Sequence, residues 1–285
     1  MSGRSIFLGG VAWLVGVGLT GCGARSANVV SPARPATRVH DEPAANRGLS
    51  ARVEGHTRED VRHFTSPAIV IGFVGGFVKR GDAVHSPVQV AERLRKAYPS
   101  GVHVEVFENR HRDGAYRRIL ELLDAEHTGK PSDAEKRDAK IVIYGMSWGG
   151  SETVALAREL KDDKIPVLLT VQVDSVAKAG QNDEVIPANV AEAANFYQTD
   201  GLLHGRAQIR AEKEAATRIL GNFHYEYKTK SPNCDEYPWY DRLFTKYHTK
   251  IECDPEVWNR VESLIRAKLP PVEENAAKKG PDSQH

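Results

Sequence analysis

Short apolar runs alternate with amphipathic segments through the middle of the chain, and this alternation limits the folds that the chain can adopt. The apolar runs predict strands at residues 68–77, which end in a glycine turn, and at 102–107, 140–146, 166–173 and 218–227. The other segments predict helices at 87–98, 115–126, 149–160 and 187–197, and a last helix that begins at Pro255 behind Asp254 as its N-cap. Strands and helices in alternation are typical of a parallel sheet covered on both faces. The sequence therefore predicts an α/β fold, a three-layer α/β/α sandwich with a mainly parallel sheet.

The composition is that of an ordinary globular protein without an excess of either charge. Of 285 residues, 40% are hydrophobic and 27% are charged, and 39 basic residues balance 38 acidic ones. This balance gives no electrostatic reason to bind a nucleic-acid backbone, so we expect no nucleic-acid partner. Three cysteines are too few for a disulfide-dense scaffold or for a zinc site made of cysteines alone. The sequence contains no Walker loop or metal-ligand motif, and we expect neither a metal nor a cofactor.

The N-terminal residues have the pattern of an export signal. Arg4 precedes an apolar stretch at residues 6–19, which ends in Leu-Thr-Gly-Cys at residues 19–22. This tetrapeptide resembles the lipobox of bacterial lipoproteins, in which the cysteine becomes the lipidated first residue of the mature chain. The resemblance implies that residues 1–21 are a lipoprotein signal peptide, that Cys22 is lipidated, and that the protein is anchored to a membrane of the bacterial cell envelope. An ordinary secretory signal and a buried N-terminal helix are the alternatives.

The rest of the chain divides into three segments by composition. Residues 22–61 are rich in Ala, Arg, Pro, Ser and Asn and read as a flexible tether. Residues 62–269 contain all the predicted strands and helices, and they are long enough to form one well-buried core. Residues 270–285 are polar, and we expect a disordered tail there.

A serine between two glycines follows the third predicted strand. Residues 145–150 read Gly-Met-Ser-Trp-Gly-Gly, a G-x-S-x-G pattern between a predicted strand and a predicted helix. Glycines flank such a serine because the turn is too tight for side chains there, and the turn raises the serine hydroxyl above the sheet. We therefore take Ser147 as a candidate nucleophile; the alternative is a glycine-rich turn without catalysis.

A nucleophilic serine needs a histidine as base and an acid to orient that histidine. Asp174 follows the strand at 166–173, and strand carboxyl ends are where open α/β sheets place their sites. A cap for the following loop is its alternative role. The histidines outside the predicted tails that follow the serine are His204, His224 and His248. His248 lies in a predicted loop before the last helix, His224 lies inside a predicted strand, and His204 lies beside a helix.

An oxyanion hole needs two backbone N–H groups that point at the developing negative charge. One is expected from Trp148, the residue after the serine. The other is expected from the glycine turn after the first strand, at Gly76 and Phe77. A tight strand-to-helix turn that binds nothing is the alternative.

These elements together resemble the α/β-hydrolase superfamily, in its serine esterase, lipase and thioesterase branch, over residues 66–269. The resemblance implies that Ser147 is the nucleophile, His248 the general base and acid, and Asp174 its orienting partner. Five predicted strands, where the full fold has about eight, imply a compact version of it. The acid of this family usually follows a later strand than Asp174 does. The alternatives to Asp174 are Asp235, Glu236 and Asp241.

Two cysteines remain besides Cys22. An exported chain meets an oxidising compartment, so Cys234 and Cys253 are expected to form a disulfide that brackets His248.

The favoured function is a serine hydrolase that cleaves an ester or thioester of a small-molecule or lipid-like acyl substrate through an acyl-enzyme. An acyltransferase with the same three residues and a non-catalytic binding module on the same scaffold are the alternatives.

Overall fold

The computed structural model describes residues 67–272 of the chain. The predicted signal peptide at 1–21, Cys22, the tether at 22–61 and most of the tail at 270–285 lie outside the described residues. Within residues 67–272, no helix is both long enough and apolar enough to cross a membrane.

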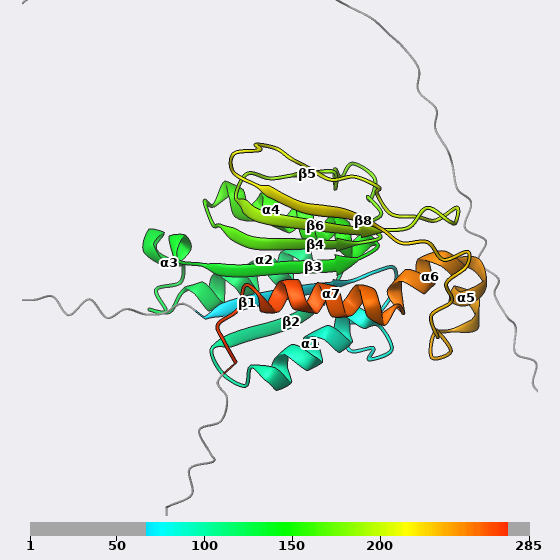
Figure 1. Cartoon of the computed structure of the whole chain (residues 1–285). Helices are drawn as coiled ribbons and strands as arrows, with labels where there is room; N and C mark the ends of the chain where they lie inside the picture. Colours follow the sequence, from blue (N-terminus) through cyan, green and yellow to red (C-terminus); the bar gives the residue numbers. More distant parts are fainter. Residues whose placement is uncertain (1–66, 273–285) are drawn as a thin grey trace, which may run out of the picture. The chain divides into compact units, whose positions relative to one another are not determined.

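Six parallel strands form the central sheet, in the order β2-β1-β3-β4-β6-β8 (Figure 1). The strands are β1 (Ala68–Val74), β2 (Val102–Glu108), β3 (Lys140–Met146), β4 (Val167–Val173), β6 (Val190–Tyr197) and β8 (Arg218–His224). Two short strands, β5 (Val185–Ile186) and β7 (Arg210–Ala211), pair with each other outside this sheet. The predicted α/β architecture with a mainly parallel sheet is confirmed.

The sixth strand replaces a predicted helix. The helix expected at residues 187–197 is wrong, because Val190–Tyr197 is strand β6, paired with β4 on one side and β8 on the other. Its Ala and Glu residues favour a helix in isolation. Between two parallel strands, however, both faces are buried, and consecutive apolar residues such as Ala193 and Ala194 are both inside the protein. Tertiary burial therefore overrides the local preference.

Helices cover both faces of the sheet. On one face, α1 (Ser86–Ala97) and α7 (Pro255–Arg266) pack against strand residues such as Val70 and Val142. On the other face, α2 (Arg112–Leu123) and α4 (Trp148–Asp162) pack against the alternate strand residues, such as Ile71 and Ile143. A short helix, α3 (Asp133–Arg137), precedes β3. Since successive strand side chains point to opposite faces, the two cores are the two sides of the same strands.

The last helix, α7, begins where the sequence predicts. The Asp254 side chain accepts a hydrogen bond from the backbone N–H of Glu256 at 3.0 Å, and Pro255 stands in the first turn. Val257, Val261 and Ile265 are buried on its inner face. The N-cap thus fixes the point at which the chain leaves the carboxyl edge of the sheet and returns along its face (Figure 1).

The strand order places a topological switch point next to the serine. The chain runs from β1 outward to β2 and then returns past β1 to form β3, so the direction of strand addition reverses between β1 and β3. Ligands in open α/β sheets bind outside the carboxyl ends of the strands at such a reversal. The loop after β1 and the turn after β3 both lie there.

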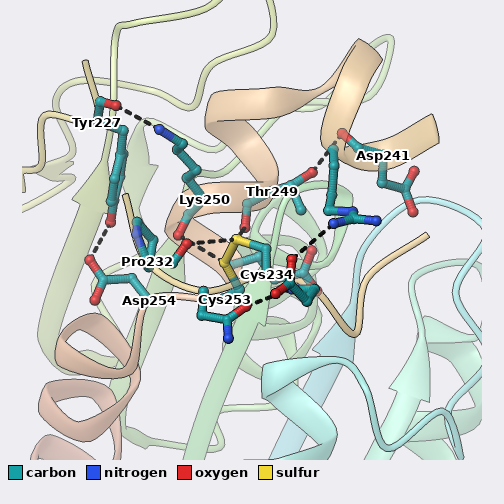
Figure 2. The surroundings of a disulfide bond; sticks show 12 residues. Tyr227, Pro232, Cys234, Asp241, Thr249, Lys250, Cys253 and Asp254 are labelled. Atoms are coloured by element: carbon teal, nitrogen blue, oxygen red, sulfur yellow. Dashed lines mark hydrogen bonds and ion pairs between the residues drawn. A yellow bond between two sulfur atoms is a disulfide. The ribbon is translucent and has the colours of Figure 1, made fainter. Parts of the chain in front are cut away.

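Two short helices, α5 (Trp239–Phe244) and α6 (Lys246–Glu252), lie between β8 and α7. A disulfide joins Cys234, before α5, to Cys253, directly after α6, with their Cα atoms 5.5 Å apart (Figure 2). The Lys250 ammonium donates to the carbonyl of Tyr227 at 2.9 Å, and the Tyr227 hydroxyl donates to Asp254 at 2.8 Å. These bonds attach α6 to the segment that follows β8 and to the start of α7.

We expect the disulfide to contribute measurably to stability. It closes a loop with a sequence separation of 19, which in the chain-entropy account is worth about 3 kcal/mol. Reduction should lower the melting temperature by about 10 °C, measured by thermal unfolding with and without reductant. The Cys234→Ser, Cys253→Ser double variant should melt at the lower temperature and should not respond to reductant. Equal melting of the parent chain in both conditions would contradict the expectation.

Candidate active site

Ser147 stands on a strained turn between β3 and α4. Its backbone has φ 57° and ψ −124°, a conformation that non-glycine residues rarely adopt. Flanking glycines make the turn possible: a Cβ on Gly145 would lie 2.3 Å from the carbonyl oxygen of Gly149, and one on Gly149 would lie 2.4 Å from that of Phe73. The geometry is that of a nucleophile elbow at a helix N-terminus.

The loop after β1 lies against this turn. A Cβ on Gly75 would lie 2.8 Å from the Cβ of Ser147, and Gly76 has a positive φ of 46°. Among the described residues, the hydrogen bonds include no acceptor for the backbone N–H groups of Trp148, Gly76 or Phe77. Unpaired N–H groups on both sides of a serine are the elements of an oxyanion hole.

Asn109 holds this loop from β2. Its side-chain amide donates to the carbonyl of Gly76, and its own backbone carbonyl accepts from Lys178 at 2.7 Å. Lys178 in turn pairs with the buried carboxylate of Glu152 on α4 at 2.8 Å. The carbonyl of Gly76 is thereby turned toward Asn109, and the peptide plane that carries the N–H of Phe77 is fixed with it.

Asp174 is buried at the carboxyl end of β4. Met146 and Val173 pair across β3 and β4, so Ser147 and Asp174 are the residues that directly follow the paired ends of two neighbouring strands. The carboxylate has no exposed surface and accepts four hydrogen bonds. Its own φ is 42°, a value that non-glycine residues rarely adopt.

His248 reaches Asp174 from α6. Its Nδ1 lies 2.6 Å from Oδ2 of Asp174, and the side chain is 10% exposed. The expected loop around His248 is wrong, because residues Lys246–Glu252 form a helical turn. With Nδ1–H donated to the carboxylate, Nε2 of the neutral ring is left as an acceptor.

The pKa of His248 is raised above its ordinary value of 6.5. Burial by itself lowers the pKa, but the hydrogen bond and charge of Asp174 raise it by more, and the carboxylates of Glu252 and Asp241 add to the effect. The site therefore stabilises an imidazolium, which is the form that a histidine base acquires when it removes a proton.

The structure brings His248 and Asp174 into contact, and it places Ser147 at the next strand end without a bond to either. Among the described residues, no hydrogen bond joins Oγ of Ser147 to the imidazole of His248. The serine is buried, with 8% of its surface exposed. Catalytic hydrogen bonds are often long without substrate and shorten when a substrate binds.

The other candidates for base and acid lie apart from this arrangement. His204 is exposed and contacts the carbonyl of Gly205, and His224 is exposed beside Thr199. Asp235 is exposed and pairs with Arg242, and Glu236 is also exposed. Asp241 is close enough to affect the pKa of His248 but makes no hydrogen bond to it within the described part of the chain.

Three residues that the sequence analysis did not single out support the site: Asn109, Gln198 and Gly205. Gln198 and Gly205 donate hydrogen bonds to Asp174. The position of Gln198 was hidden because β6, which it follows, reads as a helix in the sequence. Gly205 shows no pattern in sequence, yet a Cβ there would lie 2.4 Å from the Cα of Asp174.

No group of three or more His, Cys, Asp or Glu side chains within residues 67–272 is arranged to hold a metal ion. The chemistry that the described side chains support is proton transfer between a hydroxyl and an imidazole, beside backbone N–H donors that can stabilise a negative oxygen.

Comparison with known proteins gives distant likenesses. No family model matches the sequence, and no curated protein matches it significantly. Solved structures that the chain resembles include an arylesterase, which is 17% identical with a TM-score of 0.26. The match covers 40% of this chain and 38% of the arylesterase chain. A thermostable esterase from Pseudomonas putida is 11% identical, with a TM-score of 0.38, over 74% of this chain and 77% of that one. A dienelactone hydrolase-like phosphotriesterase from metagenomic libraries is 16% identical, with a TM-score of 0.35, over 72% and 88%. Likenesses this distant do not define an activity.

We expect the imidazole of His248 to titrate above pH 6.5 in the parent chain and below it in Asp174→Asn, where the charge is removed and the burial remains. A raised pKa means that protonated His248 stabilises the fold below the pKa of the unfolded chain, and that this contribution is lost as the pH rises through the folded pKa. Nitrogen-15 NMR titration of the histidine measures both values. A pKa at or below 6.5 in the parent would contradict the expectation.

Proposed function

We propose that this chain is a serine hydrolase that cleaves a carboxylic ester or thioester through an acyl-enzyme. The observation that carries the proposal is the buried hydrogen bond between His248 and Asp174, beside the strained turn that presents Ser147. A histidine held by a buried carboxylate next to a serine on such a turn is the arrangement that activates a hydroxyl for attack on a carbonyl.

In the first half of the proposed reaction, Oγ of Ser147 forms a bond to the carbonyl carbon, and its proton passes to Nε2 of His248. The carbonyl electrons move onto oxygen, which becomes negative and accepts hydrogen bonds from the N–H groups of Trp148 and of Gly76 or Phe77. Asp174 stabilises the imidazolium through Nδ1–H. The bond to the leaving oxygen or sulfur then breaks, and His248 returns the proton to the leaving group.

In the second half, water attacks the acyl-enzyme by the same route. His248 takes a proton from the water as its oxygen bonds to the acyl carbon, and the same N–H groups stabilise the second tetrahedral intermediate. The bond to Oγ of Ser147 breaks, the serine recovers its proton from His248, and the carboxylic acid leaves. The reaction consumes one water and needs no cofactor.

We expect a fluorophosphonate probe to label the parent chain at Ser147, and a panel of activated esters and thioesters to be hydrolysed by it. Ser147→Ala should abolish labelling, and His248→Gln should reduce it to the background, because the base is lost. Asp174→Asn should slow it by about 10³- to 10⁴-fold, because the imidazole loses both its orientation and its partner charge. Labelling is measured by gel fluorescence and the site by peptide mass spectrometry.

Two matched variants control for the loss of a buried group alone. Ser151, one turn along α4 and buried, is the control for the serine, and its hydroxyl donates to the carbonyl of Trp148 at 2.9 Å. His85 is the control for the histidine, because it is also buried and paired with a carboxylate, Glu252, at 2.7 Å. Ser151→Ala and His85→Gln should retain labelling. A folded parent chain that is not labelled, or labelling that survives Ser147→Ala, would refute the proposal.

We also propose that the protein is tethered to the cell envelope through Cys22, on the basis of the lipobox-like tetrapeptide at residues 19–22. Acyl chains on one cysteine provide membrane binding in proportion to the buried methylene groups. When the chain is produced in a bacterium, the mature form should begin at Cys22 with the mass of added acyl chains, and Cys22→Ser should leave the membrane fraction. An unmodified mature chain that begins elsewhere would be evidence against the tether.

A further inference from the structure

We propose that Gln198 is a positioning residue of the active site, which holds the carboxylate of Asp174 in the orientation that His248 requires. This inference rests on the proposed function, because an effect on kcat can be measured only if the chain is an enzyme. The contacts that carry it are independent of that function.

Gln198 is the first residue after β6, the strand next to β4, and it is completely buried. Its side-chain Nε2 donates to Oδ2 of Asp174 at 2.9 Å, and its backbone N–H donates to Oδ1 at 3.2 Å. One residue therefore holds both oxygens of the carboxylate. Because Oδ2 is also the oxygen that accepts from His248, the amide of Gln198 and the imidazole share one acceptor atom.

The orientation of the Gln198 amide is set by its other partners. Its Oε1 accepts from the backbone N–H of Asp200 at 2.8 Å, and its Nε2 also donates to the carbonyl of Leu203 at 3.0 Å. A reversed amide would place the oxygen against a carboxylate and a carbonyl and the NH₂ against an N–H group, which loses all three bonds. The donor side of the amide therefore faces Asp174.

The loop after Gln198 closes around the same carboxylate. Gly205 donates its backbone N–H to Oδ1 of Asp174 at 2.7 Å, and its lack of a Cβ permits this approach. With two donors on each oxygen, the carboxylate has no freedom to rotate about its last bond. Removing the Gln198 amide leaves Oδ2 with the imidazole as its one donor, so the oxygen that accepts from His248 loses the bond that fixes its position.

The Gln198 amide also determines the charge that His248 faces. The carboxylates that act on the imidazole are Asp174 from the end of β4, Glu252 from α6 and Asp241 from α5. Gln198 is a neutral donor to the first of these, so its amide competes with the imidazole for the negative charge on Oδ2. A residue that only filled space at this position would leave the titration of His248 unchanged.

We expect Gln198→Leu to lower kcat by about ten- to a hundredfold with little change in KM, the range for loss of one hydrogen bond to a charged group. The imidazole should titrate at a higher pH than in the parent, because the carboxylate loses a competing donor. Gln198→Met keeps the length of the side chain and fills the same buried space, but it has no N–H group to donate to Asp174. The pKa of His248 should therefore move in the same direction as in Gln198→Leu.

The pKa of His248 is measured by nitrogen-15 NMR in full-length chains that carry Ser147→Ala, and kcat and KM are measured in the same variants with Ser147 present. Gln172 supplies the matched control: it is a completely buried glutamine on β4, two residues before Asp174, and its amide donates to the carbonyl of Asp183 at 2.9 Å. Gln172→Leu should lower the free energy of unfolding. It should leave the pKa of His248, kcat and KM unchanged.

The proposal is overturned if Gln198→Leu and Gln198→Met leave the pKa of His248 at the parent value, or if Gln172→Leu shifts it equally. If Gln198→Leu does not fold, the Gln198→Met variant, which is closer in shape to the parent side chain, decides by the same measurement. The NMR comparison does not need an active enzyme. A parent chain without hydrolase activity therefore refutes the proposed function, while the pKa comparison still tests the placement of Asp174 by Gln198.

Discussion

Burying a carboxylate at the end of a parallel strand removes it from water, and the chain replaces that water with hydrogen bonds from three directions. Asp174 accepts from the residue that follows β6, from the loop that begins there, and from His248 on α6. An unpaired buried charge would cost several kcal/mol, so each of these segments is held in place by the same group. The path of the chain after β6 and the position of α6 both depend on this carboxylate.

Ser147 is placed by a different constraint, the exclusion of side chains. The turn after β3 passes so close to β1 and to the first turn of α4 that Gly145 and Gly149 cannot carry a Cβ. The positive φ of Ser147 is tolerated because these contacts determine it from both sides. Hydrogen bonds therefore position the His248–Asp174 pair, while steric contacts position the serine. The serine and Asp174 follow adjacent strand ends because β3 and β4 are neighbours in register.

Sequence reasoning predicted the parts of this arrangement that depend on local pattern. The buried strands are continuous apolar runs, the turn at residues 145–150 has a glycine pattern with a geometric cause, and Asp254 and Pro255 mark a helix start by known cap chemistry. Sequence reasoning failed where packing between segments far apart in the chain determines the secondary structure. Val190–Tyr197 contains Ala and Glu and reads as a helix, and only its place between β4 and β8 makes it a strand. The helical turn around His248 is too short for a periodic signal.

The misread strand explains why Gln198 could not be singled out from the sequence while Asp174 could. Asp174 is found from its own sequence neighbourhood, since a carboxylate after an apolar run marks a strand end. Gln198 is meaningful only if the segment before it is a strand next to β4, because only then does its side chain arrive beside Asp174. A residue that acts through a contact with another residue can be recognised only if the helices and strands that carry both are assigned correctly. Asp174, at the end of β4, contacts His248 only because α6 lies at that strand end, and the Cys234–Cys253 bridge and the Lys250–Tyr227 bond hold that short helix in place.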